Sequence, residues 1–194
     1  MLFDQNELDY KINQIATSNI LKIENSQANK VGYQITEKCD LSNYLSIDEI
    51  LEKDIELISQ GAFSMHQLVK FIIGLLGEKC NIYASTWATC ETVVSGLINM
   101  KQKGLINDCF FLFDHRVVRY RPNAYALFNQ NFQSKILSIH AKICVIESQN
   151  TIMRIIGSGN WTRNDKIEVY SISSKTNACF FYKNFILNEF KLQQ

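Results

Sequence analysis

The chain has 194 residues, of which 46% are apolar and 20% are charged, and its formal net charge is +1. These values are typical of one globular domain of ordinary size, and they exclude a disordered chain, a collagen and a coiled coil. The longest apolar run, Phe71 to Leu76 with Gly74 included, is far shorter than the roughly 20 residues that cross a bilayer. The N-terminus is acidic and lacks the apolar core of a signal peptide. We therefore expect a cytoplasmic protein with no membrane partner.

The charges are distributed unevenly along the chain. Residues 1–60 contain five lysines and eleven acidic residues, whereas residues 61–194 contain fifteen basic and eight acidic residues. All five arginines lie between Arg116 and Arg163. An arginine-bearing basic region suits an anionic partner such as a phosphodiester, although a solvated basic surface has the same composition. We predict an acidic N-terminal extension of residues 1–60 and a domain of residues 61–194.

The cysteines are widely spaced. They occupy positions 39, 80, 90, 109, 144 and 179, and no two are closer than ten residues. This spacing excludes a CxxC motif and a zinc-ligand cluster. Most of the cysteines lie in apolar runs, so we expect buried free thiols in a reducing compartment.

The first expected elements precede residue 80. Residues 20–23 and 31–35 have the composition of a short strand pair. Ser46 and Glu49 form a capping-box pattern, and apolar residues at helical spacing continue to Ile58, so we expect a helix there that ends before Gly61. A second helix is expected from Ser64 to Leu76.

From residue 80 onward, strands alternate with helices. Strands are expected at residues 80–87, 109–113, 135–147, 151–156 and 168–173, and helices are expected to begin at Thr89, Pro122 and Asn177. This alternation predicts an α/β domain with a mixed sheet flanked by helices.

The chain has three histidines, at positions 66, 115 and 140. His66 lies in the first turn of an expected helix, where a surface or capping role is expected. His115 follows a strand end, a place where α/β proteins carry functional groups. His140 shares one face of an expected strand with Lys142, so an imidazole and an ammonium can meet one phosphate. A structural histidine beside a solvated lysine is the alternative.

A short polar turn, residues 157–160 (Gly-Ser-Gly-Asn), follows the next expected strand. Its two glycines allow backbone N–H groups to approach an anion, and Ser158 and Asn160 add neutral donors. Glu168 on the following strand can accept a hydrogen bond from the second nitrogen of His140 and so select its tautomer. A plain hairpin turn has the same composition, so the turn alone does not identify a site.

The complete pattern is His140-x-Lys142-x4-Glu147, then Gly157-Ser158-x-Asn160, then Glu168. It resembles the His-Lys-Asp motif of the phospholipase D superfamily and the Gly-Ser-x-Asn that follows that motif. The resemblance is closest over residues 135–173; the order of elements from residue 64 is also similar, and residues 1–60 are not covered. It implies a phospholipase D-like fold, a mixed sheet flanked by helices with one motif per chain.

The resemblance also implies a role for each motif residue. His140 would be the nucleophile and form a phosphohistidine. Lys142 and Asn160 would bind the phosphate with help from Ser158, and Glu168 would orient the histidine. Glu147 stands where the family has aspartate, a structural ion-pair partner. The family needs no metal or other cofactor, and this chain has no carboxylate cluster or HExxH motif.

One motif per chain implies a dimer. The family uses two motifs per active site, and neither His66 nor His115 is followed by a lysine two positions later. Short single-motif members complete the site across a two-fold axis. We therefore expect a homodimer in which one His140 attacks and the other protonates the leaving oxygen.

The expected activity is a metal-independent phosphodiesterase, an endonuclease that cleaves DNA or RNA. All five arginines are candidates for backbone contacts, Arg116 and Arg163 first among them. Trp161, with Trp87 and Tyr120, can stack on bases, although core or rim packing is the alternative for each. A lipid or small phosphodiester hydrolase and a catalytically silent module that binds nucleic acid or protein are the other hypotheses. Residues 1–60 would be an interaction arm, a shield for the basic domain, or an added cap of its core.

Overall fold

The computed structural model describes residues 11–13, 20–25, 29–38, 40–163 and 165–191. The strands are β1 Lys11–Asn13, β2 Ile20–Asn25, β3 Lys30–Ile35, β4 Asp54–Gln60, β5 Cys80–Thr86, β6 Ile106–Asp114, β7 Gln133–Leu137, β8 Lys142–Glu147, β9 Ile152–Gly157 and β10 Ile167–Ser173. The helices are α1 Ile47–Glu52, α2 Met65–Leu76, α3 Glu91–Gln102, α4 His115–Tyr120, α5 Pro122–Asn131 and α6 Thr176–Lys191, with a 3-10 turn at Leu41–Asn43.

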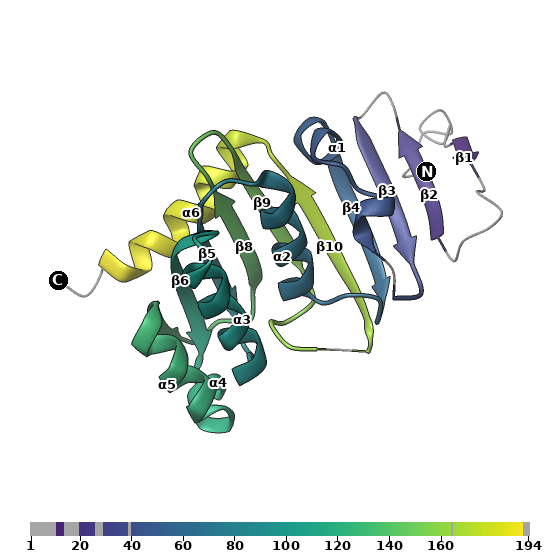
Figure 1. The fold of residues 1–194 in the computed structure, drawn as a ribbon. Helices are drawn as coiled ribbons and strands as arrows, with labels where there is room; N and C mark the ends of the chain where they lie inside the picture. Colours follow the sequence, from purple (N-terminus) through teal and green to yellow (C-terminus); the bar gives the residue numbers. More distant parts are fainter. Residues whose placement is uncertain (1–10, 14–19, 26–28, 39, 164, 192–194) are drawn as a thin grey trace, which may run out of the picture.

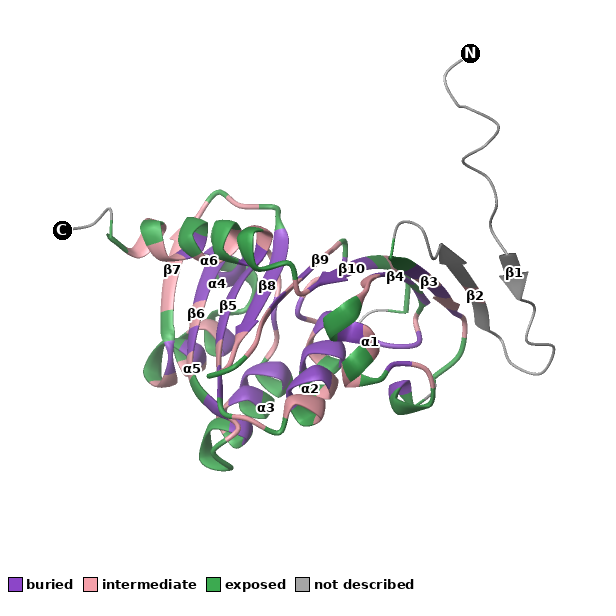
Figure 2. Cartoon of the chain, turned by 90° about the horizontal axis from the view of Figure 1, so that it is seen from above, coloured by how far each residue is buried: buried purple, intermediate pink, exposed green. Residues whose placement is uncertain are grey.

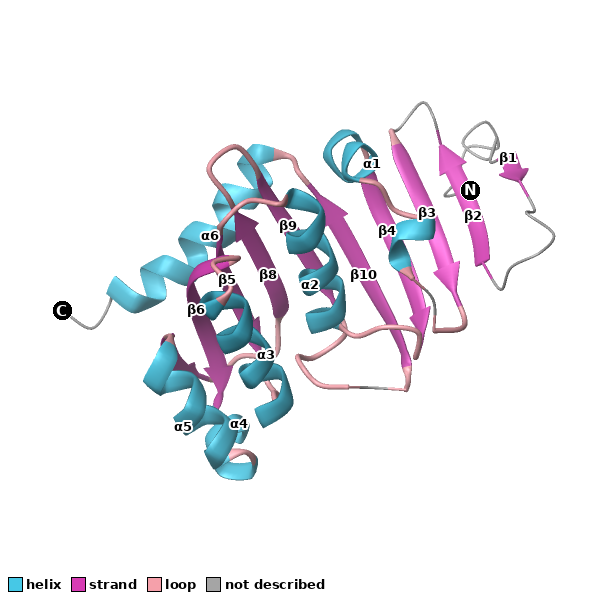
Figure 3. Cartoon of the chain, in the orientation of Figure 1, coloured by secondary structure: helices cyan, strands magenta, loops and turns pink. Residues whose placement is uncertain are grey.

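The described strands form one mixed sheet (Figures 1 and 3). Their order is β1-β2-β3-β4-β10-β9-β8-β5-β6-β7. The pairs β3–β4, β5–β6 and β6–β7 are parallel, and the other neighbours are antiparallel. Helices flank this sheet, so the expected α/β class with a mixed sheet is confirmed.

Helices cover both faces of the sheet. Figure 2 shows α6 on one face and α1, α2 and α3 on the other. The larger apolar core lies on the α2–α3 side and includes Ile72, Val94 and Phe111. A smaller core lies under α6, where Ile186 packs with Leu112 and Val145. Strands that are buried on both faces explain the nearly continuous apolar runs of β5, β6 and β8.

Most of the elements expected from local patterns are present. Strands β2 and β3 pair as an antiparallel hairpin. Helix α2 begins with the capping box of Ser64 and Gln67 and ends at Gly77, whose φ of 62° is left-handed. This combination of a polar N-cap and a C-terminal glycine is a strong helix signal in any sequence.

The helix expected from residue 46 to Ile58 is wrong beyond its first turns. Ser46 caps α1 by accepting a hydrogen bond from the Glu49 N–H at 3.2 Å, but α1 ends at Glu52. Residues 54–60 instead form β4, between β3 and β10. In β4, Ile55 and Leu57 are buried while alternate residues are exposed, a strand period of two. Pairing with two neighbouring strands outweighed the helical spacing of the apolar residues.

The single strand expected at residues 135–147 is also wrong. The chain forms β7 up to Leu137 and β8 from Lys142, with an irregular segment of residues 138–141 between them. This segment contains His140, so His140 does not lie on a strand face. The short helix α4, directly after β6, was not expected.

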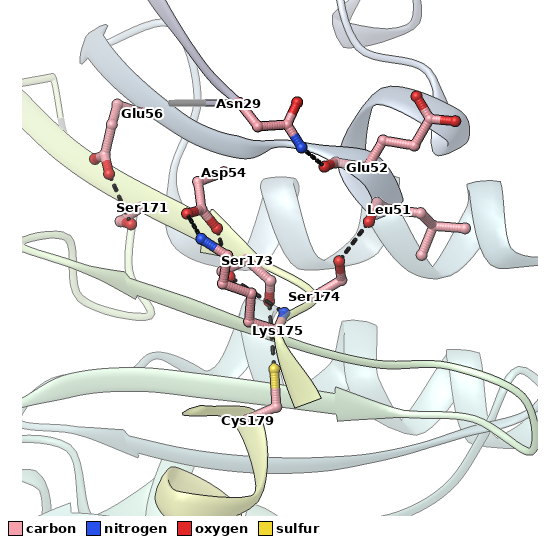
Figure 4. Close-up of polar contacts among 10 residues, drawn as sticks. All are labelled: Asn29, Leu51, Glu52, Asp54, Glu56, Ser171, Ser173, Ser174, Lys175 and Cys179. Atoms are coloured by element: carbon pink, nitrogen blue, oxygen red, sulfur yellow. Dashed lines mark hydrogen bonds and ion pairs between the residues drawn. The ribbon is translucent and has the colours of Figure 1, made fainter. Parts of the chain in front are cut away.

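Residues of the N-terminal part are tied to the rest of the chain by polar contacts (Figure 4). The hydroxyl of Ser173 donates to Asp54 at 2.7 Å, and that of Ser174 donates to the Leu51 carbonyl at 2.6 Å. Lys175 forms an ion pair with Asp54. Strand β4 also pairs with β10 along six residues. The division of the chain at residue 60 stays a prediction, and described residues on both sides of it share one sheet.

The described cysteines are free thiols, and Cys80, Cys109, Cys144 and Cys179 are buried. Cys39 lies outside the described residues. None of the helices that the structure describes has the length and apolar character needed to span a membrane.

Candidate active site

The candidate site lies at one end of the sheet, where several strands begin or end. Strands β5 and β6 end there, β8 begins beside the end of β5, and β9 ends beside the start of β8. Strand β10 begins just beyond the end of β9. The sheet therefore brings together His140 and Lys142, the turn of residues 157–160 and Glu168, which come from separate segments of the sequence.

The segment that carries His140 is held on both sides of the histidine. The Ile139 N–H donates to Oδ2 of Asp114 at 3.3 Å, and the Ser85 hydroxyl donates to the Ala141 carbonyl at 2.9 Å. Ser85 is fully buried and Asp114 is 9% exposed. The backbone on each side of His140 is thus fixed to the end of a different strand.

His140 and Lys142 are in direct contact. The Lys142 Nζ lies 3.2 Å from both imidazole nitrogens of His140. The histidine is exposed, whereas Lys142 is only 6% exposed. Burial lowers the pKa of Lys142, the positive charge of Arg116 lowers it further, and the negative charge of Glu168 opposes both effects. An exposed imidazole beside a desolvated ammonium can contact one anion together.

Trp87, directly after β5, connects the cationic groups. Its ring lies edge-on to the His140 ring with a centroid separation of 4.9 Å. The Arg116 guanidinium lies 4.3 Å and the Lys142 Nζ 5.3 Å from the Trp87 ring centroid. Stacking on an indole stabilises a cation by about 0.5–2 kcal/mol. Trp87 therefore holds Arg116 close to the histidine–lysine pair.

Asp114 places that arginine. Its Oδ1 accepts a hydrogen bond from the Arg116 N–H at 3.0 Å, which caps α4, and lies 3.7 Å from the Arg116 Nε. The same carboxylate holds the Ile139 N–H. Asp114 thus links Arg116 to the His140 segment. Ser85 and Asp114 are polar residues at the ends of β5 and β6, and that position is the sequence signal that could have identified them.

The Gly157–Asn160 turn packs tightly against β10. A Cβ at Gly157 would lie 2.5 Å from the Val169 carbonyl oxygen, and a Cβ at Gly159 would overlap the Tyr170 hydroxyl. The Ser158 N–H donates to the Val169 carbonyl at 3.0 Å. The glycines are therefore required by packing, and the Ser158 N–H is used within the fold. The expectation that other N–H groups of this turn approach an anion stays a prediction.

Side chains of this turn point to two sides of the site. The Ser158 hydroxyl donates to Glu168 and accepts from the Val169 N–H at 3.0 Å. Oδ1 of Asn160 lies 3.2 Å from the Thr86 hydroxyl at the end of β5. This contact orients the Asn160 amide beside the strand that precedes Trp87. The expected hydrogen bond between His140 and Glu168 stays a prediction.

Glu147 lies at the far end of β8 from Lys142 and forms an ion pair with Lys183 on α6. It also accepts a hydrogen bond from the Tyr83 hydroxyl at 3.0 Å. Burial and the Glu147 charge raise the pKa of Tyr83. Five residue steps along a strand span roughly 16 Å, so Glu147 is remote from His140.

The remaining predicted site residues lie in different surroundings. Arg163 is exposed in the loop between β9 and β10, and His115 is exposed at the start of α4. The expectation that Trp161 stacks on bases is wrong: it is fully buried, and its ring packs edge-on against Phe111 at 4.7 Å. An apolar core residue with no exposed face cannot contact a ligand without unfolding.

No cluster of three or more metal-binding side chains was found among the residues that the structure describes. No family model matches the chain, and no curated protein sequence matches it.

The fold resembles a solved structure. The chain is similar to polyphosphate kinase from Porphyromonas gingivalis, with a TM-score of 0.58 and 12% sequence identity. The match covers 78% of this chain and 29% of the kinase structure, so the chain spans less than a third of that protein's length. At this identity the likeness shows the fold alone, a mixed sheet flanked by helices.

Proposed function

We propose that this chain is a metal-independent phosphodiesterase that cleaves nucleic acid through a phosphohistidine. The observation that carries the proposal is the contact of His140 with Lys142 at 3.2 Å, on a segment held from both sides. A nucleophile and a cation fixed in this way provide the positioning and charge stabilisation that phosphoryl transfer requires.

The reaction proceeds in two displacements. The neutral imidazole of His140 attacks phosphorus, an N–P bond forms, the P–O bond to the leaving nucleoside oxygen breaks, and an acid protonates that oxygen. Water then attacks the phosphohistidine, the N–P bond breaks, and the proton of the water passes to the group that had acted as acid. Lys142 and the Asn160 amide bind the non-bridging oxygens, and Glu168 orients His140.

The acid is the His140 of a second copy of the chain, which makes the active unit a homodimer. The competing candidate for the acid is His115 of the same chain, the other exposed histidine at this end of the sheet. Mixing His140→Ala protein with Lys142→Ala protein tests this assignment. If two chains share one site, the mixture contains heterodimers with a single His140, in which the leaving oxygen is no longer protonated by a second histidine. If His115→Ala removes protonation of the leaving group while homodimers persist, the acid lies within one chain.

The fold neighbour supports the general class of reaction. It is named as a kinase, so a protein with a similar fold transfers phosphoryl groups. Between nucleic acid and other phosphodiesters, the basic balance of residues 61–194 favours a polyanion.

The test is cleavage of labelled single- and double-stranded DNA and RNA in excess EDTA. We expect the wild type to cut and His140→Ala to be inactive, with His66→Ala as the matched control because His66 bonds Ser64 at the start of α2. A quench in alkaline denaturant, in which the N–P bond of a phosphohistidine survives, should leave a labelled nucleotide attached through its phosphate to His140. If wild type and His140→Ala are equally inactive on every DNA and RNA substrate, the nuclease proposal fails, and a silent binding module or a phosphodiesterase acting on another substrate becomes the better hypothesis.

A further inference from the structure

Helix α4 and the residue after it form an exposed basic surface next to the site. Of the seven residues from His115 to Arg121, only Val117 is buried. Three of them are arginines, at positions 116, 119 and 121, and the sequence has no acidic residue from 115 to 146. Arg116 is paired with Asp114, and the positive charge of the other two arginines on this exposed segment raises the local concentration of anions.

This surface is continuous with the candidate site. Asp114 caps α4, and Arg116 in its first turn lies over Trp87, whose edge faces His140. On the other side of the site, the β9–β10 loop carries the exposed Arg163. Figure 1 shows α4 and this loop at the same end of the sheet. A flexible polyanion that follows α4 therefore passes His140.

The surface also carries an exposed aromatic ring. Tyr120, at the last position of α4, is 62% exposed, and the Arg119 guanidinium lies 5.2 Å from its ring centroid. A ring held by a guanidinium offers a platform for a nucleobase, with cation–π support from the arginine. Only an unpaired base has a free face for such stacking, because bases in a duplex are covered by their neighbours.

We propose that the exposed face of α4, with Arg119, Tyr120 and Arg121, binds single-stranded nucleic acid and directs the strand to His140. The proposal rests on the proposed function for the identity of the polyanion. The arginines contact phosphates, and Tyr120 stacks on a base. A polyphosphate chain would satisfy the arginines but gives the tyrosine nothing to stack on, so Tyr120 separates the two polyanions.

The test measures binding by fluorescence anisotropy with the full chain carrying His140→Ala, so that no probe is cut. The probes are a labelled 20-nucleotide single strand, the duplex of the same sequence, and labelled polyphosphate. We expect the single strand to bind more tightly than the duplex. Tyr120→Ala should weaken single-strand binding roughly five- to 150-fold and leave polyphosphate binding unchanged.

Charge is tested by Arg119→Ala combined with Arg121→Ala. This variant should weaken binding of all three probes. The slope of log K against log salt concentration for the single strand should fall in magnitude by about 1.4, because each of the two lost phosphate contacts contributes about 0.7. The matched charge control is Lys79→Ala with Lys103→Ala, two exposed lysines that precede β5 and β6 at the opposite end of the sheet. Phe181→Ala, which removes a 68% exposed ring on α6, is the control for Tyr120→Ala.

The proposal fails if Tyr120→Ala binds the single strand as the Phe181→Ala control does, or if it weakens polyphosphate binding equally. It also fails if the arginine variant behaves as the lysine control. These outcomes are independent of cleavage: single-strand binding through α4 without cutting refutes the nuclease and leaves the binding surface intact. If the wild-type chain cuts nucleic acid and the α4 substitutions do not change cutting, only the proposed binding surface is refuted.

Discussion

Replacing Asp114 by alanine tests whether the His140 segment is held by the end of β6. The carboxylate accepts hydrogen bonds from the Arg116 and Ile139 N–H groups at 3.0 and 3.3 Å and lies 3.7 Å from the Arg116 Nε. Alanine removes all three contacts at a position that is 9% exposed. The backbone next to His140 and the arginine over Trp87 then lose their common anchor.

The expected loss of stability follows from these contacts. Loss of the α4 cap costs about 0.5–2 kcal/mol, and an unpaired Ile139 N–H costs about 1–3 kcal/mol. The ion pair with the half-exposed Arg116 adds at most about 1 kcal/mol. We expect the free energy of unfolding to fall by about 1.5–6 kcal/mol. Asp114→Asn keeps one acceptor oxygen, so it should lose roughly half as much.

The assay combines denaturant unfolding with a readout at the site. The imidazole resonances of His140 and the fluorescence of Trp87 should change in Asp114→Ala under conditions where the protein stays folded. Asp108→Ala is the matched control, since Asp108 lies near the other end of β6 and bonds the Cys109 N–H at 2.8 Å. If Asp114→Ala shifts the His140 resonances no more than Asp108→Ala does, Asp114 does not position the histidine.

Three further substitutions test other parts of the argument. Gly157→Ala should destabilise the fold by about 2 kcal/mol or more in thermal unfolding, because its Cβ would lie 2.5 Å from a backbone carbonyl oxygen of β10. Gly74→Ala, in open space on α2, should be neutral or stabilising, and equal stability of the two variants would refute the packing role. Lys142→Met should raise the unfolding free energy by about 1 kcal/mol or more at neutral pH while weakening phosphate binding. Since the Lys142 pKa is lowered, this gain should shrink as the pH rises through that pKa, and a gain that grows with pH would contradict it. Glu147→Gln should cost about 1–2 kcal/mol through its lost ion pair with Lys183 and leave the His140 resonances unchanged; a shift at His140 would place Glu147 in the site.

Most elements from residue 64 onward were predictable because each carries its own signal; α4 and the break between β7 and β8 were the exceptions. The capping box of Ser64 and Gln67, for example, involves residues three apart. The helix predicted up to Ile58 was wrong because the apolar residues of this segment fit both a helix and, from Ile55, a strand. The choice was made by β3 and β10, which lie on either side of β4 in the sheet. The hydrophobic periodicity of a short segment contains no information about strand partners that are distant in the sequence.

The motif residues could be chosen from the sequence, and their roles stay predictions; the contacts that hold them could not be predicted. His140, Lys142 and Glu168 were identified from their types and spacing. The anchors of the histidine segment are separated from it by 25 residues for Asp114 and 56 residues for Ser85. Those contacts also explain why β7 and β8 are separate, since a continuous strand would direct the Ile139 and Ala141 backbone groups into sheet pairing instead. The histidine and lysine meet through this break, and not through strand alternation.

The charges at the site oppose the stability of the fold. Lys142 is nearly buried, Arg116 is close enough to lower its pKa, and an indole brings both cations to one histidine. Glu168 offsets part of this repulsion, and its carboxylate is also engaged by Ser158. Clustered cations that destabilise a fold are expected where an anion binds. The bound anion relieves their repulsion, and this relief adds to the free energy of binding. The phosphate proposed as ligand would supply the negative charge that offsets Lys142 and Arg116.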